Sequence, residues 1–207
     1  MTLSEAARAC LRSRHNLAMG FVIRPYEDRD ERGWLICRLL SFFDTAFFDA
    51  VEREKERYDR EAIELVAEND DGKIIGLLDL ECQSDGLSSR PGTGGMIWHL
   101  ATHPDHQRQG VATALLAEAE QQARERGLVR LEAWTRDDAP TQRWYERHGF
   151  VQVDSYLHVY LERDDLRAFD DELRLVKAFA HYTGDRRDEI RQRFSRVHDD
   201  VLYEKRL

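Results

Sequence analysis

The stretch from Met96 to Gln122 constrains the fold most, because it predicts a buried strand, a tight turn and a long helix in succession. The apolar run Met96–Leu100 is typical of a short buried strand, and His103–Pro104 follows it as a turn. Gly110 then opens an Ala- and Leu-rich segment, which predicts a helix over residues 110–126. A strand that leads into a helix in this way is typical of an α/β fold.

The loop before this helix has the features of an anion-binding loop. The first N–H groups of a helix have no intrahelical acceptor and lie at the positive end of the helix dipole, so they bind phosphate without a charged side chain. Gly110 and Ala112 have little or no side chain, so a pyrophosphate can approach the backbone closely. The residues expected to bind it are Gln107, Arg108, Gln109, Gly110, Val111 and Ala112.

Composition excludes several classes of protein. A chain of 207 residues with 34% charged residues and a net charge of −9 is expected to be a soluble globular protein with no nucleic-acid partner. No apolar run approaches the roughly 20 residues that cross a bilayer, and residues 1–20 lack the apolar core of a signal peptide. The three cysteines are widely spaced, which predicts neither a disulfide framework nor a zinc site built on cysteine. We therefore expect a cytoplasmic protein with no membrane partner.

The rest of the chain alternates between strand and helix patterns after an N-terminal tail at residues 1–20. Four aromatic side chains, Phe42, Phe43, Phe47 and Phe48, are interpreted as core packing in preference to an acceptor pocket. The expected strands are Phe21–Pro25, Ala62–Ala67, Lys73–Glu81, Val129–Ala133 and Phe150–Leu161, with a loop at Gln83–Gly95. The expected helices, besides residues 110–126, are Asp28–Leu39, Asp44–Tyr58 and Asp138–His148.

The C-terminal region carries two apolar stripes at helical spacing. We interpret residues 163–198 as a helical insertion, followed by a closing strand at Val201–Leu207. The alternative is a second helix that continues through Val201 to the end of the chain. An exposed apolar stripe needs a partner. The insertion is therefore expected either to form a lid over another part of the same chain or to form an interface, including that of a homodimer.

Two motifs resemble those of one enzyme superfamily. Gln107-x-x-Gly110-x-Ala112 resembles motif A of the GNAT N-acetyltransferases, in which this loop binds the pyrophosphate of acetyl-CoA. The segment Trp144–Phe150, WYERHGF, resembles the family's "LYEKLGF" segment, whose tyrosine lies near the sulfur of CoA. The resemblance implies one GNAT domain over residues 21–207, with a mixed, mostly antiparallel sheet splayed at its centre. Helices are expected on both faces of that sheet.

The resemblance also implies roles for particular residues. A backbone N–H at Leu100 or a near neighbour would polarise the thioester carbonyl, and Tyr145 would protonate the departing thiolate. Asp138 and Thr141 stand where the family often has Asn and Ala. Besides the anion-binding loop, the residues expected to bind acetyl-CoA are Leu100, Ala101, Thr102, Asp138 and Tyr145.

The general base has two candidates, His99 and Glu81, with ordered water or no dedicated base as the alternatives. His99, His103 and His106 also form H-x3-H-x2-H, but a strand and a Pro-containing turn are not expected to bring three nitrogens together on a metal. We therefore expect no metal site.

The predicted function is acetyl transfer from acetyl-CoA to a primary amine by direct attack in a ternary complex. The acceptor is expected to be a small-molecule amine of unspecified identity. The alternatives are an acyl-CoA-binding sensor without catalysis and an interaction module.

Overall fold

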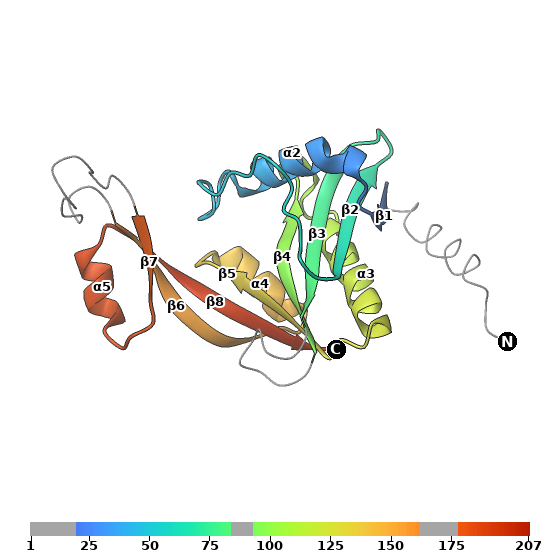
Figure 1. Cartoon of the computed structure of the whole chain (residues 1–207). Helices are drawn as coiled ribbons and strands as arrows, with labels where there is room; N and C mark the ends of the chain where they lie inside the picture. The colour runs from blue at the N-terminus through green and yellow to red at the C-terminus, as the bar shows by residue number, and fades with distance from the viewer. Residues whose placement is uncertain (1–19, 84–92, 162–177) are drawn as a thin grey trace. The chain divides into compact units, whose positions relative to one another are not determined.

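The computed structural model describes residues 20–83, 93–161 and 178–207 (Figure 1). Its eight strands form an open mixed sheet in the order β1-β2-β3-β4-β5-β8-β6-β7. The strands are β1 (Phe21–Pro25), β2 (Ala62–Asn69), β3 (Ile74–Gln83), β4 (Gly94–Thr102), β5 (Arg130–Thr135), β6 (Val151–Leu161), β7 (Ala178–Tyr182) and β8 (Arg196–Arg206). The helices of the described residues are α2 (Glu31–Phe42), α3 (Val111–Glu125), α4 (Ala139–Arg147) and α5 (Arg187–Arg193). The described residues divide into two compact units, one within Met1–Glu132 and Arg206–Leu207, the other within Ala133–Lys205.

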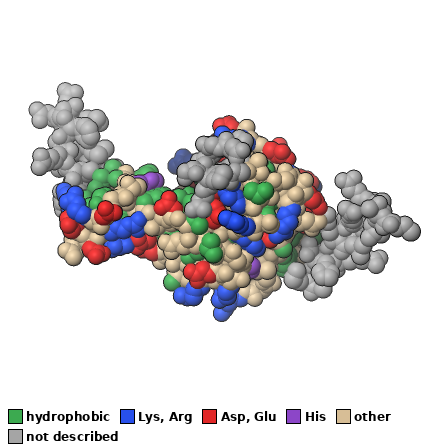
Figure 2. Space-filling view, turned by 90° about the horizontal axis from the view of Figure 1, so that it is seen from below, with side chains coloured by type: hydrophobic (Ala, Val, Ile, Leu, Met, Phe, Trp, Pro, Cys, Tyr) green, Lys and Arg blue, Asp and Glu red, His purple; other side chains and the backbone are tan. Residues whose placement is uncertain are grey.

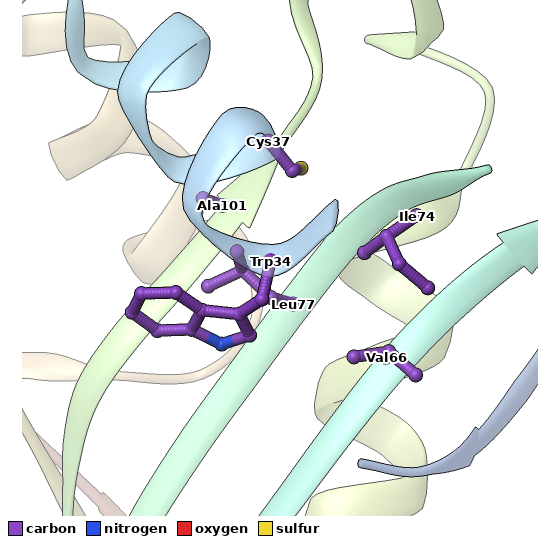
Figure 3. Close-up of a cluster of buried hydrophobic side chains, with 6 residues drawn as sticks. All are labelled: Trp34, Cys37, Val66, Ile74, Leu77 and Ala101. Atoms are coloured by element: carbon purple, nitrogen blue, oxygen red, sulfur yellow. The ribbon is translucent and has the colours of Figure 1, made fainter. Parts of the chain in front are cut away.

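The first unit is built on the antiparallel strands β1 to β4, with α2 and α3 on opposite faces (Figure 1). On the α2 face, Trp34 and Cys37 pack against Val66, Leu77 and Ala101 (Figure 3). Successive strand residues point to opposite faces, so the residue before Leu77 faces the other helix. Asp79 and Glu81, two and four residues after Leu77, point to the same face as Leu77. The α2 face therefore combines an apolar core with these two carboxylates.

Glycine sets the approach of α3 to the other face of the sheet. A Cβ at Gly76 would lie 2.5 Å from Val111 Cγ1 and 3.0 Å from Leu115 Cδ1. Only a residue without a side chain lets the start of α3 lie this close to β3. The position of Val111, and with it the anion-binding loop, therefore depends on this contact.

The second unit is built on β6, which pairs antiparallel with both β7 and β8. Helix α4 precedes it, with Pro140 in its first turn. Gly149, with a φ of +84°, follows the helix and allows the chain to turn into β6. Tyr145 of α4 is buried against Phe150 and Tyr203 of the same unit.

The order of elements agrees with the sequence prediction from Phe21 to Leu161, apart from one helix. No helix forms at Asp44–Tyr58, where the chain makes turns and irregular structure. The interpretation of the Phe cluster as core is also wrong at two positions, because Phe43 is 67% exposed and Phe48 is 52% exposed. Side chains of α2 explain why this segment is not helical. Arg38 Nη1 donates to the Ala50 carbonyl at 2.6 Å, and Glu31 accepts from the Lys55 amide at 3.0 Å, so backbone groups are satisfied without a helix.

The C-terminal region differs from the predicted helical insertion over 163–198. Residues 178–182 form β7, which pairs with the edge of β6 that β8 does not occupy. Helix α5 ends at Arg193, before the apolar residues Phe194 and Val197. The closing strand is confirmed and begins earlier than expected, at Arg196, so the alternative of a helix through Val201 is wrong. Three predicted parts lie outside the described residues: the tail at 1–19, most of the Gln83–Gly95 loop, and the first apolar stripe except Ala180, which lies in β7.

Candidate functional site

The anion-binding loop connects β4 to α3. The His103 amide donates to the Ile75 carbonyl at 2.9 Å, and a 3₁₀ turn at Pro104–His106 follows. The His103 ring accepts the Asp105 amide at 3.2 Å, which caps this turn. The loop then runs through Gln107 to Gly110 with all four residues exposed.

Two residues of this loop have left-handed backbone conformations. Arg108 has a φ of +60° and Gly110 has a φ of +85°, and Arg108 is the one non-glycine residue of the described chain with a positive φ. Left-handed residues in a turn direct successive N–H groups to one side and form an anion-binding concavity. Ala114 donates to the Gly110 carbonyl at 2.9 Å, whereas the amides of Val111 and Ala112 have no backbone acceptor among the described residues. The loop therefore presents free amides at the positive end of α3.

A β-bulge lies just upstream of this loop, in β4. Asp79 pairs with His99 and Leu80 pairs with Ile97, so Trp98 is an extra residue opposite β3. Its side chain is 48% exposed, and its indole N–H donates to Glu81 Oε2 at 3.0 Å. Bulges interrupt the ladder and re-aim side chains, and they are common beside active sites. Leu100, the candidate carbonyl-polarising residue, pairs with Leu78 two positions after the bulge.

His99 is buried on the α2 face and both of its ring nitrogens have partners. Nε2 lies 3.1 Å from Glu56 Oε2, and Nδ1 accepts from Arg38 Nε at 3.4 Å. Because a guanidinium can only donate, the Nδ1 atom is the acceptor and the ring proton lies on Nε2, toward Glu56. Burial, followed by the charge of Arg38, lowers the pKa of His99 to about 3. His99 is therefore a neutral ring that positions the Glu56 carboxylate.

Glu56 is a site residue that the sequence analysis missed. It lies within Asp44–Tyr58, the segment predicted to be a helix, and nothing in its local pattern distinguishes it from its acidic and basic neighbours. Burial, followed by the charge of Glu52, raises the pKa of Glu56. Its side chain is half exposed and lines a cavity of about 550 Å³. The other charged residues that line the same cavity are Glu27, Asp28, Glu64, Lys55, Arg57 and Arg60.

Lys55, the residue before Glu56, connects this part of the chain to the sheet. Its side chain is 3% exposed, and its Nζ atom lies 3.0 Å from Asp79 Oδ2 and also pairs with Glu64. The rings of Tyr26, Trp34 and Tyr58 surround the ammonium at 4.8 Å, 5.3 Å and 5.1 Å from their centroids. Carboxylates together with aromatic faces stabilise a desolvated cation.

Asp79 is the buried partner of that lysine. Its side chain is fully buried, Tyr58 donates a hydrogen bond to Oδ2 at 3.1 Å, and Oδ1 has no partner among the described residues. Burial raises the pKa of Asp79 to about 6, although Lys55 opposes that change. Glu81, the other candidate base, lies two residues further along β3 with 7% exposure, and its Oε1 atom is 3.7 Å from Arg60 Nη1. The structure thus brings His99 and Glu81 together on the α2 face, beside the bulge.

Ala101 and Thr102 are the last two residues of β4 in the first unit, and the other predicted site residues, Tyr145 and Asp138, lie in the second unit. Tyr145 is 6% exposed, and burial raises the pKa of its phenol. Its ring centroid lies 5.1 Å from that of Phe150 and 5.6 Å from that of Tyr203. Asp138 precedes α4, and its carboxylate accepts a hydrogen bond from the Thr141 hydroxyl, which holds the charge at its own helix. The Asp138–Thr141 pair therefore gives both departures from the family pattern a local structural role.

The histidine pattern at 99, 103 and 106 does not form one cluster within the described chain. The rings of His103 and His106 have centroids 5.7 Å apart, while both nitrogens of His99 face Glu56 and Arg38. Charged side chains of both signs are interspersed over the face shown in Figure 2. None of the described helices combines the length and apolar character that a membrane span requires.

The comparison with protein families gives one match. The model of the "Acetyltransferase (GNAT) family" matches residues 25–150. This range contains the bulged strand, the anion-binding loop, α3 and α4. A search of curated proteins finds no match.

Solved structures with the same fold include three N-acetyltransferases. The ribosomal-protein-S18-alanine N-acetyltransferase of Escherichia coli has a TM-score of 0.57 and 15% identity, over 90% of this chain and 93% of that one. NAA60 of Arabidopsis thaliana, solved in complex with a bisubstrate analogue, has a TM-score of 0.58 and 18% identity, over 90% and 97%. The PaiA N-acetyltransferase of Thermoplasma acidophilum, solved in complex with coenzyme A, has a TM-score of 0.54 and 13% identity, over 90% and 99%.

Proposed function

The chain belongs to the GNAT family of acetyltransferases, and we propose that it transfers an acetyl group from acetyl-CoA to a primary amine by direct attack in a ternary complex. The observation that carries this proposal is the exposed loop with left-handed Arg108 and Gly110, directly after a bulged strand and at the start of α3. Structures of relatives with coenzyme A and with a bisubstrate analogue support a site that holds both substrates together.

The backbone of the loop is proposed to bind the pyrophosphate. The amides of Val111 and Ala112 would donate to its oxygens, and Gly110 would allow close approach because it has no side chain. The co-substrate supplies a thioester, whose carbonyl carbon accepts the amine. A backbone N–H of β4 near Leu100 is proposed to donate to the carbonyl oxygen as negative charge develops there.

Glu56 is proposed as the group that removes the proton from the amine. Its carboxylate is held by His99, and a raised pKa brings a carboxylate closer to the range of an effective base. The amine nitrogen then forms a bond to the acyl carbon, the carbon–sulfur bond breaks, and Tyr145 donates to the departing sulfur. Glu81 stays the second candidate base, because it lies beside the bulge and accepts a hydrogen bond from Trp98.

The acceptor is proposed to be a small cationic amine. Four carboxylates and three cations line the cavity in the first unit, and one of the cations, Lys55, is already paired with Asp79 and Glu64. The excess of carboxylates raises the local concentration of cations. A primary ammonium could enter this cavity and lose its proton to Glu56. The chemistry favours cationic amines as a class and does not select one member of that class.

The pH dependence of kcat/KM tests the proposed base. Because His99 has a pKa of about 3, it stays neutral between pH 5 and 9 and adds no limb to the profile. Protonation of the Glu56 carboxylate should instead lower the rate as the pH falls. A lysine-like alkylamine, with a pKa of about 10.4, remains protonated throughout this range, so it is the acceptor to use in this test.

Three variants assign this acid limb. Glu56→Gln should abolish it, while His99→Asn should lower the rate and keep the limb. Asp79, with a pKa of about 6, titrates in the same range, so Asp79→Asn is the comparison variant. An acid limb that survives Glu56→Gln and disappears in Asp79→Asn would assign the base to Asp79.

Replacing Gly110 with Val should weaken acetyl-CoA binding by roughly 10- to 100-fold, because a β-branched residue is strained at a φ of +85° and blocks the backbone approach. Calorimetry with acetyl-CoA measures this change. Gly127→Val is the matched control, since Gly127 has a φ of +79° at the other end of α3 and a Cβ there meets nothing within 4 Å. Equal loss of affinity in both variants would show that strain, and not the loop, is responsible.

The proposed function is tested by following the release of free CoA thiol from acetyl-CoA with a panel of primary amines. Amine-dependent release supports acetyl transfer. Tight binding of acetyl-CoA with no release for any amine would favour the alternative of an acyl-CoA sensor. Absence of acetyl-CoA binding would contradict both and leave an interaction module.

A further inference from the structure

Three potential metal ligands lie on one sheet face of the second unit. His158 of β6 is directly opposite His181 of β7, and Tyr156 of β6 is directly opposite Asp200 of β8. Directly opposed residues share a face, as do residues two apart on one strand. His158, His181 and Asp200 therefore come from three adjacent strands and project to the same side of the sheet.

The distances between these side chains are close to those of a metal site. One ligand atom from each residue lies within 4.8 Å of the other two, and His158 Nδ1 is 3.3 Å from Asp200 Oδ2. Bonds of about 2.0–2.2 Å to a tetrahedral zinc ion place neighbouring ligand atoms roughly 3.3–3.6 Å apart. One pair already has that separation. His181 is exposed, so a side-chain rotation can bring its nitrogen closer.

His158 is buried, and its Nδ1 atom is the nitrogen that faces Asp200 and the proposed ion. His158 is 6% exposed, and its Nε2 atom is buried with no hydrogen-bond partner among the described residues. His181 makes ring contacts with Tyr156 and His158, and within the described ranges it has no hydrogen bond.

The Asp200 carboxylate also has neighbours outside the proposed ligand set. Arg136 Nε is 3.7 Å from Asp200 Oδ1, whereas Oδ2 faces His158. Tyr156 hydrogen-bonds to the same carboxylate. His198 is directly opposite His158 on β8, but its Nδ1 is 2.7 Å from Asp137 Oδ1 and its Nε2 accepts from Arg196 Nε at 3.3 Å. These contacts engage His198 outside the cluster.

We propose that His158, His181 and Asp200 bind a divalent transition-metal ion, with one imidazole nitrogen from each histidine and one oxygen from the aspartate. Two imidazoles and a carboxylate are a ligand set that binds zinc and related ions, with the fourth position open to water. The ion would cross-link β6, β7 and β8. The proposal is independent of the acetyl-CoA loop, because all three ligands belong to the second unit.

The test is calorimetric titration of the full chain, free of any histidine tag and stripped of metal, with zinc chloride. We expect one ion per chain, and cobalt(II) should give absorption bands of nitrogen and oxygen coordination. His181→Ala should raise the dissociation constant for zinc by roughly 10- to 100-fold. Because His181 is exposed, its removal leaves no cavity, and Asp200→Asn provides a second ligand variant.

His198→Ala is the matched control, since it removes a histidine from the same face without removing a proposed ligand. Zinc should raise the melting temperature of the wild type and of His198→Ala, and should leave that of His181→Ala unchanged. Stoichiometry below about 0.1 ion per chain, unchanged affinity in His181→Ala, or equal weakening in His198→Ala would each overturn the proposal.

Discussion

Replacing Lys55 with Met is expected to lower the free energy of unfolding by about 3–5 kcal/mol at neutral pH. The Lys55 ammonium is the cation that faces the fully buried Asp79 at 3.0 Å. Without it, a buried carboxylate keeps its charge only at a large desolvation cost, and Asp79 Oδ1 already has no partner among the described residues. Glu64 also loses an ion pair, but its side chain is 36% exposed, so water can replace that contact.

The loss of stability should depend on pH in a defined direction. Burial raises the folded-state pKa of Asp79 to about 6, above its usual value of about 3.9 when unfolded. Between these values the folded state binds more protons, so stability falls as the pH rises. Removing Lys55 should raise the folded pKa further. The variant should therefore be closest to the wild type near pH 4–5 and furthest from it near pH 8.

Urea unfolding at several pH values measures these differences. Arg57→Met is the matched control, because its side chain is 76% exposed and lies 3.7 Å from an exposed Asp28, so it should change stability by less than about 1 kcal/mol. Adding Asp79→Asn to Lys55→Met should recover part of the loss, because it removes the buried charge. A Lys55→Met protein as stable as Arg57→Met at pH 8 would contradict this account of the cluster.

The parts of the site that follow from local signals were predictable from the sequence. The anion-binding loop is indicated by three signals that lie close together in the sequence. They are a strand, a turn with proline, and a glycine before an alanine-rich helix. Their positions agree with β4, the turn at Pro104–His106 and α3. The sequence also named His99 and Glu81 as candidate bases, because the predicted strands place them near the loop. They lie on β4 and β3, and their catalytic roles stay predictions.

The residues that sequence reasoning missed depend on contacts between distant segments. Lys55 and Glu56 occur in the run Glu52–Arg57, which has the charge pattern of an exposed helix. Their roles arise because Asp79 and His99 face them from β3 and β4. In the same way, β7 forms by pairing with an edge of β6 that the sequence does not reveal. Local periodicity contains no information on such partners.

Replacing Tyr145 with Phe is expected to lower kcat by roughly 10- to 1,000-fold, if the hydroxyl donates to the departing sulfur as proposed. Burial raises the pKa of this phenol, so it stays protonated at working pH. A thiol has a pKa of about 8.5 and a phenol about 10, so complete proton transfer to the thiolate is already unfavourable without burial. The hydroxyl is therefore expected to act as a hydrogen-bond donor that stabilises charge on sulfur as the carbon–sulfur bond breaks.

Binding and stability should change little in the same variant. The ring contacts with Phe150 and Tyr203 do not involve the hydroxyl, which makes no hydrogen bond to the described residues. Calorimetry with acetyl-CoA and thiol-release kinetics with a reactive amine separate affinity from turnover. Tyr203→Phe is the matched control, because it removes a hydroxyl from the ring stacked on Tyr145. That hydroxyl donates to Glu146 Oε1 at 3.4 Å. If Tyr145 is the donor to the leaving group, only the loss of its own hydroxyl should lower kcat. An equal fall of kcat in both variants, or no fall in either, would show that Tyr145 is a packing residue of α4.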